Sequence, residues 1–73
     1  MSEDKIIEKV LQECKIDYSG DKDKEMTLQS VQLVSLIVAL EEEFDIEVPD
    51  EYMVFEALNT YHKIENMLRE VRV

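Results

Sequence analysis

Apolar residues recur at helical spacing in three stretches of the chain, and no stretch alternates with the period of a strand. The first helix is expected from about Glu3 to Cys14, with Ser2 as its cap. The last follows a cap at Asn59 or Thr60. Their apolar faces are Ile6, Ile7, Val10, Leu11 and Cys14 in the first, and Tyr61, Ile64, Met67, Leu68 and Val71 in the last. Each face suits a helix that covers a small core.

The second helix, expected from about Ser30 to Glu43 with Thr27 or Ser30 as its cap, is too apolar for a helix with one buried face. One stripe fits a core position: Leu33, Leu36, Ile37, Leu40 and Phe44. A second stripe, Val31, Val34 and Val38, lies partly outside the first. Val34 and Val38 suit a core role equally well. Apolar side chains at the surface beside acidic ones would form a docking face.

Two irregular segments join these helices. The polar stretch from Lys15 to Glu25 contains the only glycine and predicts a long loop, with Ile16 and Tyr18 anchored on the core. After Pro49, a short helix is expected from Asp50 to about Glu56. The core residues expected around it are Phe44, Ile46, Val48, Phe55 and Leu58. The sequence therefore predicts one all-α domain over residues 1–73, a small four-helix bundle of three main helices and one short helix.

The alternating carboxylates of the long loop raise the possibility of a calcium site. An EF-hand loop beginning at Asp21 needs glycine at its sixth position and glutamate at its twelfth. These positions are Met26 and Gln32. A solvated acidic loop is the preferred interpretation, and no metal site is predicted.

Eighteen acidic and eight basic residues give a net charge of −10, which disfavours nucleic acid and anionic membranes as partners. No Lys or Arg lies between Lys24 and Lys63, so one end of the domain should attract basic protein surfaces. The single Cys14 fits a reducing, cytoplasmic compartment and a buried or half-buried thiol. The only histidine, His62, has no matching nucleophile, and an enzyme is not expected in a chain of 73 residues.

The stretch LQSVQLVSLIVALEEEFDIEVPDE, from Leu28 to Glu51, resembles the carrier-protein family, which comprises acyl carrier proteins and the related peptidyl and aminoacyl carriers. That family has Asp-Ser-Leu at the start of a helix of the type V-E-L-V-x-x-L-E-E-E-F, followed by an acidic-apolar segment that ends in I-P-D. The likeness spans the helix order of the whole chain and is most specific from Ala39 to Asp50.

The resemblance implies a carrier fold and a monomer. It places Ser30 on the serine that receives 4'-phosphopantetheine from coenzyme A through a phosphopantetheinyl transferase. The arm would hold acyl, aminoacyl or peptidyl cargo as a thioester, in fatty acid, polyketide or nonribosomal peptide biosynthesis or in cell-wall acylation. Acyl- or aminoacyl-processing enzymes with basic patches would be the other partners. The positions expected to contact partners are Gln29, Val31, Val34, Val38, Glu41 and Glu42.

The chain departs from the family beside the serine, where Asp-Ser-Leu is replaced by Gln29-Ser30-Val31. In the family that aspartate helps to engage the transferase, and Ser30 alone is also a common type of helix cap. An alternative is therefore kept open: a carrier-like acidic interaction module that is not modified.

Overall fold

The computed structural model describes residues 3–71, and all regular structure within this range is helical. The elements are α1 (Glu3–Glu13), α2 (Ser30–Phe44), the 3₁₀ helix η1 (Asp50–Tyr52), α3 (Phe55–Leu58) and α4 (Tyr61–Val71). The predicted small all-α bundle with three main helices is confirmed. The cap expected at Ser2 lies outside the described residues.

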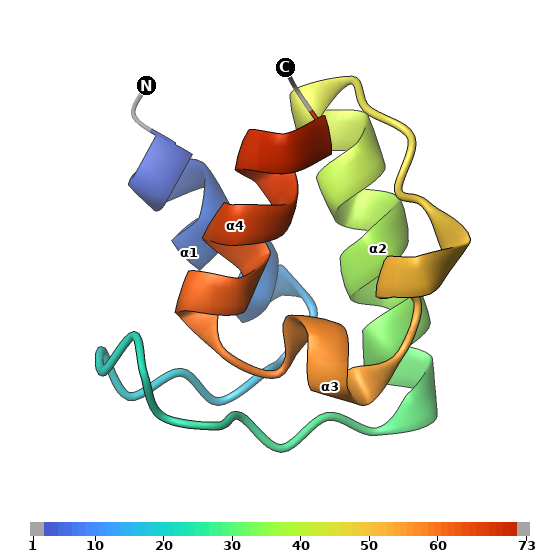
Figure 1. The fold of residues 1–73 in the computed structure, drawn as a ribbon. Coiled ribbons are helices and arrows are strands. Elements are labelled where there is room, and N and C mark those ends of the chain that lie inside the picture. The colour runs from blue at the N-terminus through green and yellow to red at the C-terminus, as the bar shows by residue number, and fades with distance from the viewer. Residues whose placement is uncertain (1–2, 72–73) are drawn as a thin grey trace.

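The long helices run side by side, with α1 pointing opposite to α2 and α4 (Figure 1). The start of α1 and the ends of α2 and α4 share one end of the bundle. The opposite end contains the start of α2, the short helix α3 and the long loop that connects α1 to α2. Ser30 therefore lies at the end of the molecule remote from the chain termini.

The core is formed by the apolar faces expected from the helical spacing. Leu33, Leu36, Ile37 and Leu40 of α2 are buried, as are Ile7, Val10 and Leu11 of α1 and Tyr61, Ile64, Met67 and Leu68 of α4. Loop residues close its edges: Ile16, Met26 and Val48 are buried, and Tyr18 stacks on Tyr61 with ring centroids 5.0 Å apart. The anchoring roles expected for Ile16 and Tyr18 are confirmed.

Helix α1 ends in a Schellman motif that fixes the direction in which the loop leaves. Lys15 adopts a left-handed conformation with φ of 59°. The Ile16 N–H donates to the Leu11 carbonyl at 2.9 Å, and the Lys15 N–H donates to the Gln12 carbonyl at 3.0 Å. Because Leu11 and Ile16 are both buried, the motif also has its usual apolar contact.

The caps of the other two long helices differ in how well the sequence predicts them. At α4, one of the two expected residues is correct, since the Lys63 N–H donates to Thr60 Oγ1 at 3.1 Å. At α2, the expected caps Thr27 and Ser30 are wrong. The cap is Gln29, whose backbone is extended and whose carbonyl accepts from the Leu33 N–H at 3.0 Å. Ser30 is the first helical residue, which leaves its hydroxyl free of a capping role.

The helix predicted from Asp50 to Glu56 is interrupted. The 3₁₀ turn of η1 ends at Tyr52, and the β-branched Val54 is extended, with φ of −134°, before α3 begins. This break changes which side chains of the segment face the core. Phe55 is 39% exposed, so its expected core role is wrong, whereas Leu58 and Val48 are buried as expected. Phe44 and Ile46 are half-buried and pack against the core.

Candidate functional site

Ser30 is exposed at the first position of α2, where a side chain projects from the end of a rigid element. The first turn of a helix has backbone N–H groups without intrahelical partners, and the helix dipole favours negative charge there. The first turn of α2 contains no acidic side chain. An anionic group attached to Ser30 would therefore meet partial positive charge and no nearby carboxylate from that turn.

One side chain holds the start of α2 in place. The Gln29 N–H donates to Gln32 Oε1 at 2.8 Å, and Gln32 Nε2 donates to the Lys15 carbonyl at 2.8 Å. Gln32 thus connects the cap of α2 to the end of α1. This role was not predicted from the sequence. A signal was present, because a glutamine three residues after a cap is one half of a capping box.

The three valines assigned to partner contacts form one exposed surface, here called the valine face: Val31, Val34 and Val38. They are 67%, 61% and 46% exposed. These fractions exclude the core interpretation that the sequence left open for Val34 and Val38. An apolar stripe this exposed along one helix is typical of an interaction site.

A shallow apolar groove of about 290 Å³ begins beside the valine face. It is lined by Leu33, Val34, Ile37, Val38, Glu41 and Met53. Ser30, Val34, Ile37 and Glu41 are three or four residues apart in sequence and so lie on one side of α2. The groove therefore extends along the helix from the turn that follows Ser30.

The three consecutive glutamates at the end of α2 have different environments. Glu41 is half-buried, and its Oε2 accepts from the Val48 N–H at 3.0 Å, which fixes the chain that leaves α2. Glu43 pairs with Lys9 of α1 at 3.2 Å, and this hydrogen bond raises the Lys9 pKa. Glu42 is exposed. Of the two glutamates predicted to meet partners, Glu42 is thus the more accessible, and Glu41 also has a structural role.

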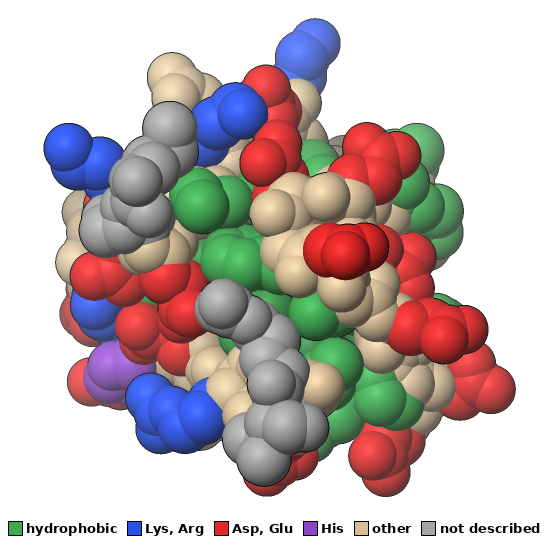
Figure 2. Space-filling view, turned by 90° about the horizontal axis from the view of Figure 1, so that it is seen from above, with side chains coloured by type: hydrophobic (Ala, Val, Ile, Leu, Met, Phe, Trp, Pro, Cys, Tyr) green, Lys and Arg blue, Asp and Glu red, His purple; other side chains and the backbone are tan. Residues whose placement is uncertain are grey.

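The charge is unevenly distributed over the surface. In the space-filling view, the side formed by α2 and the segment after it presents acidic and hydrophobic side chains together (Figure 2). The valine face itself carries no charge, since α2 is free of ionisable residues from Ser30 to Leu40. The carboxylates of α2 begin at Glu41, which lies roughly 16 Å along the helix from Ser30 at 1.5 Å per residue.

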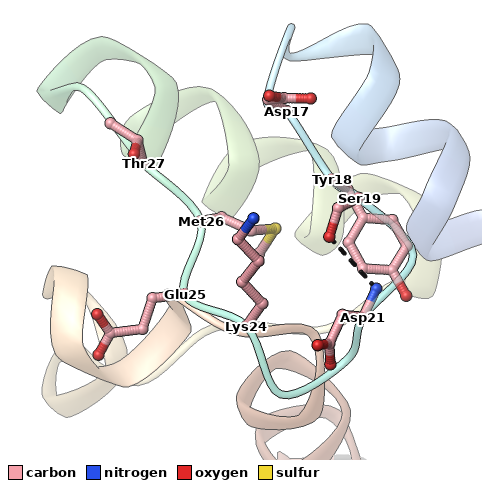
Figure 3. A pocket seen from close by; sticks show the side chains of 8 residues that line it. All are labelled: Asp17, Tyr18, Ser19, Asp21, Lys24, Glu25, Met26 and Thr27. Carbon is pink, nitrogen blue, oxygen red and sulfur yellow. Dashed lines mark hydrogen bonds between the residues drawn. The ribbon is translucent and has the colours of Figure 1, made fainter.

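The carboxylates of the long loop do not point toward a common centre that could bind a metal ion. A small pocket lies between Asp17, Tyr18 and the chain from Ser19 to Thr27. Figure 3 shows the carboxylates of Asp17, Asp21 and Glu25 pointing in different directions, with the Lys24 side chain between them. In residues 3–71, no group of three or more His, Cys, Asp or Glu side chains is placed to hold a metal ion.

Cys14 and His62, the other two residues considered for chemistry, make structural contacts. Cys14 is half-buried, and burial raises the pKa of its thiol, with a smaller contribution from Glu13. His62 Nδ1 lies 2.5 Å from Asp23 Oδ1, and the backbone N–H of His62 donates to the Lys22 carbonyl at 3.2 Å. His62 therefore fastens the long loop to α4. Over the described range 3–71, no helix has the length and apolar character needed to cross a membrane.

Comparison with protein-family models, curated proteins and solved structures found no match to this chain. The functional assignment therefore depends on the residues and geometry described above.

Proposed function

We propose that this protein is an acyl, aminoacyl or peptidyl carrier that is modified on Ser30 with 4'-phosphopantetheine. The observation that carries the proposal is the placement of Ser30. Its side chain is exposed at the start of α2, beside an uncharged apolar surface and at the end of the molecule away from the chain termini. The motif from Leu28 to Glu51 resembles the carrier family, and this resemblance aligns Ser30 with the serine that is modified in that family.

The residues around Ser30 fit a phosphodiester. The positive end of the α2 dipole would stabilise its negative charge by about 0.3–1 kcal/mol. The groove from Val34 to Glu41 offers apolar surface to an arm that leaves Ser30. When attached, the group supplies a terminal thiol that holds cargo as a thioester.

Attachment is proposed to require a partner enzyme, because within residues 3–71 no base is hydrogen-bonded to the Ser30 hydroxyl. The only histidine contacts Asp23 at the loop. In the transfer, the Ser30 oxygen bonds to a phosphorus of the coenzyme A pyrophosphate, and the pyrophosphate P–O bond breaks. Adenosine 3',5'-bisphosphate leaves, and the hydroxyl proton passes to a base on the phosphopantetheinyl transferase.

The partners are proposed to dock on the valine face, with Glu42 contributing charge and Gln29 lying beside the reacting serine. Val31 and Val34 would enter an apolar patch, and Glu42 would face basic residues farther from the reaction centre. Exposed charge of this kind mainly raises the association rate and loses its effect in salt. The acyl- or aminoacyl-processing enzymes would then meet the same surface in turn.

Intact-mass measurement after incubation with coenzyme A and phosphopantetheinyl transferases tests the proposal. We expect one phosphopantetheine on the wild type and on Ser35→Ala, a matched exposed serine of the same helix, and no addition on Ser30→Ala. An unmodified wild-type chain with every transferase of its own genome would overturn the proposal. A partner complex unaffected by Ser30→Ala would then favour the unmodified interaction module.

A further inference from the structure

Gln32 links the start of α2 to the chain that leaves α1, in addition to the core contacts and the Lys9–Glu43 ion pair that join the two helices. Its Oε1 accepts from the Gln29 N–H and its Nε2 donates to the Lys15 carbonyl, both at 2.8 Å. The segment between the end of α1 and the start of α2 has no regular structure. One amide side chain therefore ties the first turn of α2 to the residue that follows α1.

Gln32 is the hydrogen-bond partner of two backbone groups at helix ends, the Gln29 N–H and the Lys15 carbonyl. The first N–H groups of a helix and the carbonyls after its end have no intrahelical acceptor or donor. Glutamine is not among the residues preferred as helix caps, so Gln29 is a weak start for α2. Helix termini without caps fray, and Ser30 lies directly between Gln29 and Val31 in the turn that would open.

We infer that Gln32 is a positioning residue for the modification of Ser30. This inference rests on the proposed function. By holding Gln29 and the end of α1, Gln32 keeps the Ser30 hydroxyl in one place when a transferase docks on the valine face. A transferase must align the hydroxyl with phosphorus, and a reacting group that is free to move lowers the rate of the chemical step. The part of the valine face beyond the first turn of α2, Val34 and Val38, does not depend on this bridge.

Gln32→Met is the sharpest test, because methionine keeps a similar length and a high helix propensity but can make neither hydrogen bond. With Ser35→Ala as the matched control, we expect Gln32→Met to lower the kcat for phosphopantetheine transfer roughly three- to tenfold, the lower part of the range for two lost hydrogen bonds, because both are exposed to solvent. The KM for the carrier should stay within about twofold of wild type, because Val34 and Val38 lie beyond the turn that opens.

Amide hydrogen exchange gives a second result that is independent of the transferase. The Gln29 N–H should exchange faster in Gln32→Met but remain protected in Gln32→Glu, which keeps an acceptor oxygen. Amides of Leu36 and Leu40 should keep their protection in both variants, which would separate a local effect from general loss of stability. An unchanged kcat in Gln32→Met, or unchanged exchange at Gln29, would overturn the inference. If the wild type is never modified, the proposed function fails, while the exchange data still establish whether Gln32 holds the helix start.

Discussion

Tyr61 joins α1, the long loop and α4, so its hydroxyl offers a direct test of how the bundle is held together. The side chain is fully buried. Its hydroxyl lies 3.1 Å from the Asp4 carbonyl oxygen and 3.0 Å from Asp4 Oδ1. Its ring stacks on Tyr18, and Lys22 Nζ lies 4.9 Å from the ring centre. Tyr61→Phe keeps the ring and removes only the hydroxyl.

The expected loss of stability follows from that hydroxyl. A hydrogen bond to a charged group contributes about 1.5–3 kcal/mol. The Asp4 side chain is 55% exposed, so solvent screening reduces this contribution, and we expect the free energy of unfolding to fall by about 1 kcal/mol. For a domain of this size, the corresponding decrease in Tm is roughly 4–8 °C.

The same residue predicts a pH dependence. Burial, and next the hydrogen bond to Asp4, raise the pKa of Tyr61 well above its ordinary value of 10.0. In alkali the unfolded chain therefore releases this proton first. Stability linked to Tyr61 is fully present below pH 10 and is lost as the pH rises above it. Tyr18, through burial, and Tyr52, through its hydrogen bond to Glu70, also have raised pKa values and add to this loss.

Urea unfolding followed by circular dichroism, at pH 7 and at about pH 11, measures both effects. Tyr61→Phe should be less stable than wild type at pH 7 and should lose less stability on going to the alkaline pH. Tyr52→Phe is the control at pH 7 only, because its hydroxyl bonds Glu70 at the surface and itself contributes to the alkaline loss. The reasoning is refuted if Tyr61→Phe matches wild type at pH 7, or if its alkaline loss is as large as that of wild type.

Two further predictions concern the two faces of α2. Leu40→Ala should lower the free energy of unfolding by about 2–5 kcal/mol, because Leu40 is fully buried. Val38→Ala, on the exposed face, should lower it by less than about 1 kcal/mol. Equal losses of the two variants in urea unfolding would contradict the assignment of the faces. Val34→Ser should leave Tm within a few degrees of wild type but raise the KM of a docking transferase roughly five- to thirtyfold, as expected for about 1–2 kcal/mol of lost apolar contact. Steady-state kinetics would measure this change, and an unaffected KM would exclude Val34 from the docking surface.

The main helices and the core could be predicted because each long helix repeats its apolar residues at the helical period. That period also separated Leu33, Leu36, Ile37 and Leu40 from the exposed valine face. It did not apply at Phe55, because Val54 interrupts the helix and changes which side chains turn inward. A short segment offers too few periods to reveal such a break.

The candidate site was predictable to a similar degree. The position of Ser30 at a helix start follows from local spacing, whereas spacing alone left core and exposed positions equally open for Val34 and Val38. The link from Gln32 to the end of α1 does not follow from spacing, because its acceptor is the main-chain carbonyl of Lys15, 17 residues away. A main-chain acceptor leaves no mark in the sequence, and its proximity is set by how α1 and α2 pack.

The central claim is that Ser30 carries a covalent arm in the cell. Intact-mass and fragmentation measurements on the protein isolated from the cells that encode it test this claim most directly. We expect one phosphopantetheine group per chain, located on Ser30. A chain isolated without the group from cells with active phosphopantetheinyl transferases, or a group on another residue, would contradict it.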